Sequence, residues 1–161
     1  MALQQKLASD VVPFMERWAV YRKHFVAGWG DMDFNAHMRN TAYLDRAADV
    51  RMMYLAEHGF PMTELRRLKI GPVIMKDEIE YYREIQLLEE FDADLALAGL
   101  AEHGGRFIMV NRFFGPDAKP VAKVTSVGSW LDLTVRKLVP APPVLLKALS
   151  EMPRSEDFKV L

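Results

Sequence analysis

The sequence predicts an α+β fold in which a curved antiparallel sheet wraps around one long central helix. Three observations support this prediction. One strand-like segment precedes a long segment that contains no Gly or Pro until Gly59, and four further strand-like segments follow. Short turns join strands in this second group, and hairpins force antiparallel pairing. Because a sheet buries one face against another layer, the long helix has to cover that face.

The first strand is expected within residues 19–29, where β-branched and aromatic side chains become frequent, and Gly30 ends it. The long helix is expected from about Thr41 to His58. Asn40 is the expected N-cap, because its short side chain accepts a hydrogen bond from a first-turn N–H. Gly59 is a good residue for the position after the helix. The apolar face of this helix contains Tyr43, Leu44, Ala47, Ala48, Val50, Tyr54 and Leu55.

After the long helix, residues 61–69 are expected to form a short second helix, and Gly71-Pro72 is expected to be a turn or a break between elements. Four strand-like segments follow, and the alternation of apolar and polar residues is clear in residues 91–100. The strands are expected at residues 73–82, 91–100, 106–114 and 121–133. A closing helix is expected at residues 144–150, with Pro143 near its first position. The other face of the sheet has no obvious cover, so this face or an edge strand is expected to meet a second copy of the chain.

The composition predicts one domain over residues 1–161, with an N-terminal arm at 1–18 and a C-terminal extension at 140–161. Half of the residues are hydrophobic and 27% are charged, which is typical of a globular protein. The net charge of −1 excludes the broad basic surface of a nucleic-acid binder. The absence of cysteine excludes disulfides, a thiolate nucleophile and Cys-ligated metal, and no metal site is expected. With no secretory signal and no membrane span, a cytoplasmic location is expected.

The segment Trp29–Leu44 contains the candidate chemistry, because two carboxylates, a histidine and two asparagines lie at the entrance to the long helix. A helix N-terminus has unpaired N–H groups and the positive end of a dipole. A developing negative charge is therefore stabilised there. Asp31 is interpreted as a turn carboxylate that accepts backbone N–H groups. Tyr43 and Trp29 are expected mainly in the core.

These motifs resemble the hotdog-fold thioesterases, most closely the 4-hydroxybenzoyl-CoA thioesterase-like branch of small acyl-CoA thioesterases. The resemblance covers roughly Val20 to Leu133. It rests on residues 29–33, 35–40 and 43–44, on Arg51 in the helix, and on the later matches at 71–74 and 80–83. It implies hydrolysis of an acyl-CoA or acyl-carrier thioester by a dimer or tetramer. No cofactor is implied, because coenzyme A arrives as part of the substrate.

The resemblance assigns Asp33 as the catalytic carboxylate and Asn40 as the residue whose backbone N–H points at the thioester carbonyl. His37, Asn35, Thr41 and Tyr43 are assigned to substrate binding. The best-studied branch has small or apolar residues where this chain has Asn35 and His37, so His37 has three open roles: orienting Asp33, binding substrate or making a structural contact.

Thioester hydrolysis needs a group that attacks the carbonyl or activates water, and a group that stabilises the oxyanion. Asp33 suits the first role, either as general base or as a nucleophile that forms a mixed anhydride. The Asn40 amide and the helix dipole suit the second. Two alternatives stay open. One is a hydratase or dehydratase on the same fold, although its usual Ser/Thr and the Pro before the His are absent here. The other is a non-catalytic acyl-ligand binder.

Overall fold

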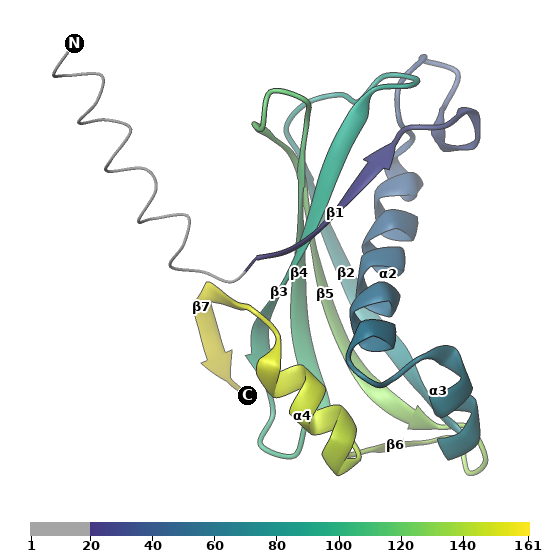
Figure 1. The fold of residues 1–161 in the computed structure, drawn as a ribbon, viewed down its shortest axis with the longest axis vertical. Helices are drawn as coiled ribbons and strands as arrows, with labels where there is room; N and C mark the ends of the chain where they lie inside the picture. Colours follow the sequence, from purple (N-terminus) through teal and green to yellow (C-terminus); the bar gives the residue numbers. More distant parts are fainter. Residues whose placement is uncertain (1–19) are drawn as a thin grey trace, which may run out of the picture.

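The structure, a computed structural model, describes residues 20–161, so the N-terminal arm expected at residues 1–18 lies outside the described residues. A strongly curved sheet wraps around the helix α2, as predicted (Figure 1). The elements in chain order are β1 (Tyr21–Val26), η1 (Trp29–Asp31), α2 (Asn40–Glu57), α3 (Met62–Leu68), β2 (Ile70–Tyr81), β3 (Glu90–Leu100), β4 (Arg106–Phe114), β5 (Pro120–Asp132), β6 (Lys137–Val139), α4 (Pro143–Glu151) and β7 (Arg154–Val160).

The main sheet has the strand order β1-β3-β4-β5-β2, with antiparallel pairing throughout this path. Both β1 and β7 pair with β3. The first is antiparallel to the beginning of β3, and the second is parallel to its end. β6 extends the sheet beside the end of β5. The α+β arrangement and the antiparallel hairpins expected from the sequence are therefore confirmed.

The central helix α2 buries the predicted apolar face against the concave side of the sheet. Ala42 and Ala47 are fully buried, and their small side chains let the helix backbone approach the strands. The ring of Tyr43 meets the ring of Phe113 edge to face, with 5.3 Å between centroids. The helix ends as predicted, because Gly59 adopts a positive φ of 87° directly after the C-cap residue. These contacts fix both the depth and the direction of α2.

Two expectations about the strands and core are wrong. Gly71 and Pro72 do not form a turn; they belong to β2 and pair with Leu131 and Trp130 of β5. Proline is tolerated there because β2 is an edge strand. Proline has no N–H to donate, and an edge strand has no neighbour on its outer side that would require one. Trp29 is not in the core, because it lies in the short η1 helix with 83% of its surface exposed.

The C-terminal region forms the expected closing helix α4, which begins at Pro143. It packs near the C-terminal half of α2, where the hydroxyl of Tyr54 donates to the carbonyl of Ala148 at 2.8 Å. The sequence pattern predicts neither β6 nor β7, since both are short or exposed strands that pair only through the tertiary fold. The second copy expected at a sheet face or edge stays a prediction.

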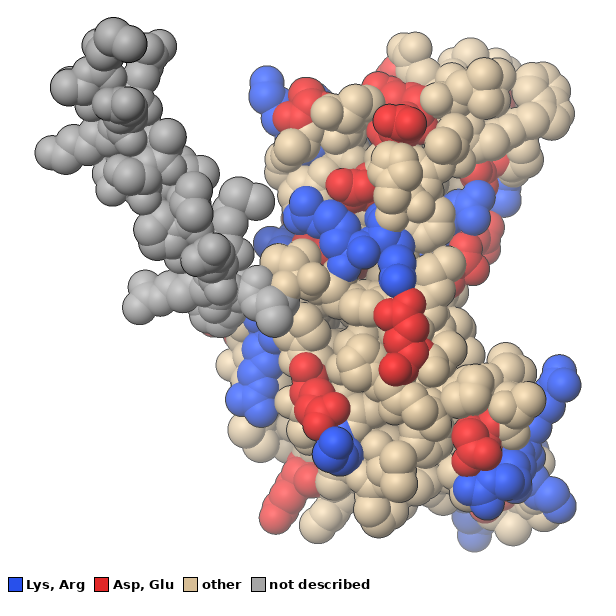
Figure 2. Space-filling view, in the orientation of Figure 1, with Lys and Arg blue, Asp and Glu red and all other residues tan. Residues whose placement is uncertain are grey.

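Acidic and basic side chains are interspersed over the face of the molecule drawn in Figure 2, which agrees with the net charge of −1. This face therefore has no broad field of one sign. Within residues 20–161, no helix is long and apolar enough to cross a bilayer.

The fold depends on close packing at Gly128 of β5, which gives a first prediction. A Cβ atom there would overlap the Phe107 ring and lie 2.9 Å from the carbonyl oxygen of Val73. We expect Gly128→Ala to lower the free energy of unfolding by about 1–3 kcal/mol, because overpacking shifts both strands. Gly30→Ala is the matched control, since nothing lies within 4 Å of its added Cβ. Equal urea midpoints for the two variants would contradict this account.

Candidate active site

The loop between β1 and α2 forms a small hairpin that brings Asp33 and His37 together. The Asp33 N–H donates to the His37 carbonyl at 3.0 Å, and Ala36 makes the turn with a φ of 67°. The Met38 N–H then donates to the Ile85 carbonyl at 2.7 Å, which ties the hairpin to the segment after β2. The carboxyl group of Asp33 and the ring of His37 are thereby held on one side of the loop.

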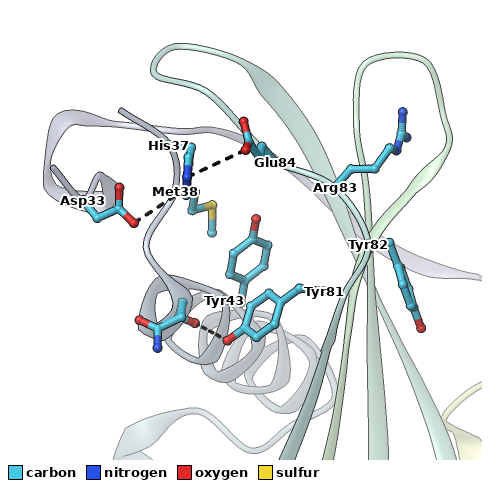
Figure 3. Close-up of a pocket in the computed structure, with 9 residues that line it drawn as sticks. Asp33, His37, Met38, Tyr43, Tyr81, Tyr82, Arg83 and Glu84 are labelled. Atoms are coloured by element: carbon cyan, nitrogen blue, oxygen red, sulfur yellow. Dashed lines mark hydrogen bonds and ion pairs between the residues drawn. The ribbon is translucent and has the colours of Figure 1, made fainter. Parts of the chain in front are cut away.

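This hairpin, the first turn of α2 and the end of β2 with the residues after it surround a pocket of about 370 Å³. Three separate chain segments therefore contribute to one site. Figure 3 shows Tyr43 and Tyr81 inside the pocket, with Tyr82 and Arg83 directed away from Asp33. The residues that line it are Asp33, His37, Met38, Asn40, Tyr43, Tyr81, Tyr82, Arg83 and Glu84.

The carboxyl group of Asp33 divides its two oxygens between the loop and the pocket. Oδ1 accepts the Asn35 N–H at 2.8 Å, which fixes the side chain in a turn. Oδ2 lies 3.7 Å from Nδ1 of His37. The side chain of Asp33 keeps 27% of its surface exposed, so the carboxyl group is accessible to water.

The first turn of α2 lies beside this carboxylate. Asn40 is the first residue of the helix, so the N-cap is Arg39 and not Asn40 as expected. The side-chain Oδ1 of Asn40 nevertheless accepts a hydrogen bond within the first turn, from the Thr41 N–H at 3.0 Å. The Asn40 N–H has no intrahelical partner at this position, and it donates no hydrogen bond to any residue from 20 to 161. Asn40, a residue that lines the pocket, therefore has an amide donor with no acceptor among residues 20–161.

Two tyrosines complete the wall near the helix. The hydroxyl of Tyr81 donates to the Asn40 carbonyl at 3.0 Å, so the end of β2 is tied to the first turn of α2. Burial, together with the nearby Tyr81, Glu84 and Glu89, raises the pKa of Tyr43 to about 12. Burial also raises the pKa of Tyr81. Both phenols stay protonated at neutral pH and keep their O–H as a donor.

Asp31 has a different environment from Asp33, although the two are only two residues apart. It is buried, and its carboxylate accepts the Gly28 N–H at 2.9 Å and Nη2 of Arg46 at 2.9 and 3.1 Å. Burial opposes ionisation, but the Gly28 and Arg46 hydrogen bonds outweigh it and lower the pKa of this carboxyl. Asp31 is therefore structural, as the sequence predicts.

The pocket contains four of the residues proposed from the sequence: Asp33, His37, Asn40 and Tyr43. Tyr43 is buried in the core and also lines the pocket. The other two, Asn35 and Thr41, are exposed and do not line the pocket, so their roles in substrate binding stay predictions.

The sequence assigns no role to Tyr81 and Glu84, which lie more than 35 residues beyond the loop in the chain. The strand expected at residues 73–82 and the resemblance at 80–83 place this segment in the sheet, but neither connects it to the loop of Asp33. Within residues 20–161, no three or more His, Asp or Glu side chains are arranged so that they could hold a metal ion.

Over residues 27–149, the sequence matches the family model described as the thioesterase-like superfamily. The fold is similar to that of a hypothetical protein from Staphylococcus aureus in complex with CoA, with a TM-score of 0.77, 15% identity and 83% of each chain covered. It is also similar to a 1,4-dihydroxy-2-naphthoyl-CoA thioesterase from Synechocystis, with a TM-score of 0.74, 12% identity, and 83% of this chain and 97% of that chain covered. A DHNA-CoA thioesterase from Staphylococcus aureus gives a TM-score of 0.75 and 12% identity, with 82% and 89% covered. None of the curated proteins matches the sequence.

The Asp31–Arg46 pair gives a prediction about pH and stability. At pH 7, Asp31→Asn should lower the free energy of unfolding by about 1–3 kcal/mol, because it removes a charged, buried acceptor. The folded-state pKa of Asp31 lies below its unfolded value. Its contribution is therefore complete above the unfolded pKa of about 4 and is lost as the pH falls through the folded pKa.

Urea unfolding at pH 7, 5 and 3 measures this effect, and the gap between wild type and Asp31→Asn should narrow at the lowest pH. The matched control is Asp45→Asn, which removes an exposed carboxylate that pairs with Arg39 at 3.2 Å. This control should change stability little at any pH. If the difference in free energy of unfolding between wild type and Asp31→Asn is the same at pH 7 and pH 3, the charge of Asp31 is not the cause of the lost stability.

Proposed function

The chain belongs to the thioesterase-like superfamily, and we propose that it hydrolyses an acyl-CoA or acyl-carrier thioester to the free acid and the thiol. The observation that carries this proposal is that Asp33 and Asn40 line the same pocket. One has an accessible carboxylate, and the other has a first-turn amide without an acceptor among residues 20–161. The similar structure in complex with CoA supports coenzyme A as one of these two thiols.

In one route, Asp33 acts as a general base. Its free Oδ2 takes a proton from water while the water oxygen attacks the thioester carbonyl carbon. In the other route, the carboxylate oxygen attacks the carbonyl itself and forms a mixed anhydride, which water then hydrolyses. In both routes the C–S bond breaks, and the thiolate leaves and takes up a proton. A thiol is a fairly strong acid, so this departure needs no dedicated general acid.

The Asn40 N–H and the positive end of the α2 dipole are proposed to hold the oxyanion that forms at the carbonyl oxygen. The helix has 18 residues and its first turn opens into the pocket, so the dipole acts on that point. The Tyr81 hydroxyl positions this turn through the Asn40 carbonyl. The Tyr43 hydroxyl makes no hydrogen bond within residues 20–161 and is proposed to donate to the substrate. His37 is proposed to contact the same ligand or Asp33.

Thiol release from a panel of aliphatic and aromatic acyl-CoAs tests the proposed activity, with Asp33→Asn as the variant. The amide keeps the size of the side chain but neither accepts the proton nor attacks the carbonyl, so we expect thiol release to be abolished. The fold should persist, because Asp33 is partly exposed and outside the core. Asp45→Asn is the control, because it removes one negative charge at an exposed position of α2 outside the pocket.

Three outcomes contradict the proposal. Full activity of Asp33→Asn would remove Asp33 from the mechanism. Hydration of an enoyl-CoA by the wild type, followed at its conjugated band and without thiol release, would favour the hydratase alternative. Tight binding of acyl-CoA without turnover across the panel would favour the non-catalytic binder.

The role of the Asn40 amide is tested by Asn40→Pro, which removes the N–H and keeps the carbonyl. Proline is well accommodated at the first helical position, and Arg39 already has the extended ψ of 150° that precedes proline. We expect kcat to fall by about 10²–10³-fold, the usual loss for one oxyanion donor. Asn40→Ala removes only the side chain and should lose much less. Similar losses in the two variants would assign the effect to the side chain instead.

A further inference from the structure

His37 lies between two carboxylates that come from different parts of the chain. Its Nδ1 is 3.7 Å from Oδ2 of Asp33, and its Nε2 is 3.9 Å from Oε1 of Glu84 (Figure 3). Each ring nitrogen therefore faces an oxygen of a different acid. Both distances are longer than a direct hydrogen bond, as is common in sites that tighten when substrate binds. The proposed chemistry uses Asp33 but leaves Glu84 without a role.

Backbone contacts hold the segment of Glu84 beside the hairpin of His37. The Met38 N–H donates to the Ile85 carbonyl at 2.7 Å, and His37 forms a β-bridge with Gln86. The Gln86 N–H in turn donates to Glu89 Oε2 at 2.8 Å. Glu84 therefore lies beside His37 because the backbone fixes it there, even though 66% of its side chain is exposed.

The arrangement Asp33–His37–Glu84 links the two carboxylates through the histidine ring. An ionised carboxylate only accepts hydrogen bonds, so a ring nitrogen that faces one has to carry a hydrogen in order to pair with it. A neutral imidazole has one N–H, so the partner at one ring nitrogen determines whether the other nitrogen carries the hydrogen. Glu84 thus acts on Nε2 of the ring. This contact affects whether Nδ1, which faces Asp33, carries a hydrogen.

We propose that Glu84 is a positioning residue, which sets the orientation and hydrogen placement of His37 and through it the orientation of the Asp33 carboxylate. The other titratable or charged groups near this site are Tyr43, Tyr81, Tyr82, Arg83 and Glu89. Arg83 is directed away and pairs with Asp117 at 2.8 Å, and Glu89 binds the backbone of Gln86. Glu84 is therefore the carboxylate that faces His37 from the segment after β2.

This inference rests on the proposed hydrolysis, and a double-mutant cycle tests it with the acyl-CoA that the wild type cleaves best. Glu84→Gln should lower kcat by about tenfold, typical for a group that orients a functional ligand, with KM nearly unchanged. In a His37→Gln background the same change should have almost no effect, because Glu84 acts only through His37. Glu80→Gln is the matched control, since Glu80 lies in β2 and is 3.6 Å from Lys123.

A spectroscopic measurement separates this inference from the proposed function. The ¹⁵N chemical shifts of the His37 ring report which nitrogens carry hydrogen, and they need no turnover. They should change in Glu84→Gln and stay constant in Glu80→Gln.

Unchanged His37 shifts would overturn the inference whether or not the protein releases thiol. A tenfold loss in both backgrounds, a rise in KM alone, or no kinetic loss in Glu84→Gln would also overturn it. Changed shifts in a protein that releases no thiol from any acyl-CoA would uphold the contact and overturn the hydrolysis.

Discussion

The burial of one face of α2 against the concave sheet is the constraint on which the site depends. Because Ala42, Tyr43 and Ala47 are buried, the helix can neither rotate nor move away without exposing core surface. Arg51 adds a polar restraint on the sheet side of the helix, where its Nη1 donates to Ser126 Oγ at 2.9 Å and to Asn111 Oδ1 at 3.3 Å. A shifted helix would leave this guanidinium desolvated and unpaired, which is costly. The first turn of α2 is therefore held at the pocket.

Given that helix, the loop before it separates two acids that look alike in the sequence. Asp31 turns inward to Arg46 of α2, and the Arg39 N–H donates to the Asp31 carbonyl at 2.8 Å, so the loop is fixed to the helix at two points. Asp33, two residues later, lies in the hairpin turn and keeps one oxygen in the pocket. Environment, and not residue type, therefore gives one carboxylate a structural task and leaves the other partly exposed in the pocket.

The sequence predicts the central helix, the antiparallel strands and four of the pocket residues, because these depend on local periodicity and on one contiguous motif. It fails where the outcome depends on distant neighbours. The residues Gly71-Pro72 have the local signal of a turn, but pairing with β5 at the sheet edge makes them strand. Likewise, β7 is a strand only because the end of β3 is available beside it. Tyr81 and Glu84 reach the pocket through the path of β2, which no local pattern around Asp33 contains.

A site of this kind depends more on backbone position than on residue identity. The proposed oxyanion donor is an N–H group, which every residue except proline would supply at position 40. The structural neighbours share the fold at only 12–15% identity, and the fold is what places the start of the helix. The proposed chemistry then needs side chains at few points: a carboxylate at 33, and groups that orient it or the helix turn. The Tyr81 hydroxyl is one of these groups, because its bond to the Asn40 carbonyl joins the edge strand to the turn that carries the amide. Substitutions elsewhere on the surface therefore leave the proposed chemistry intact as long as α2 stays packed against the sheet.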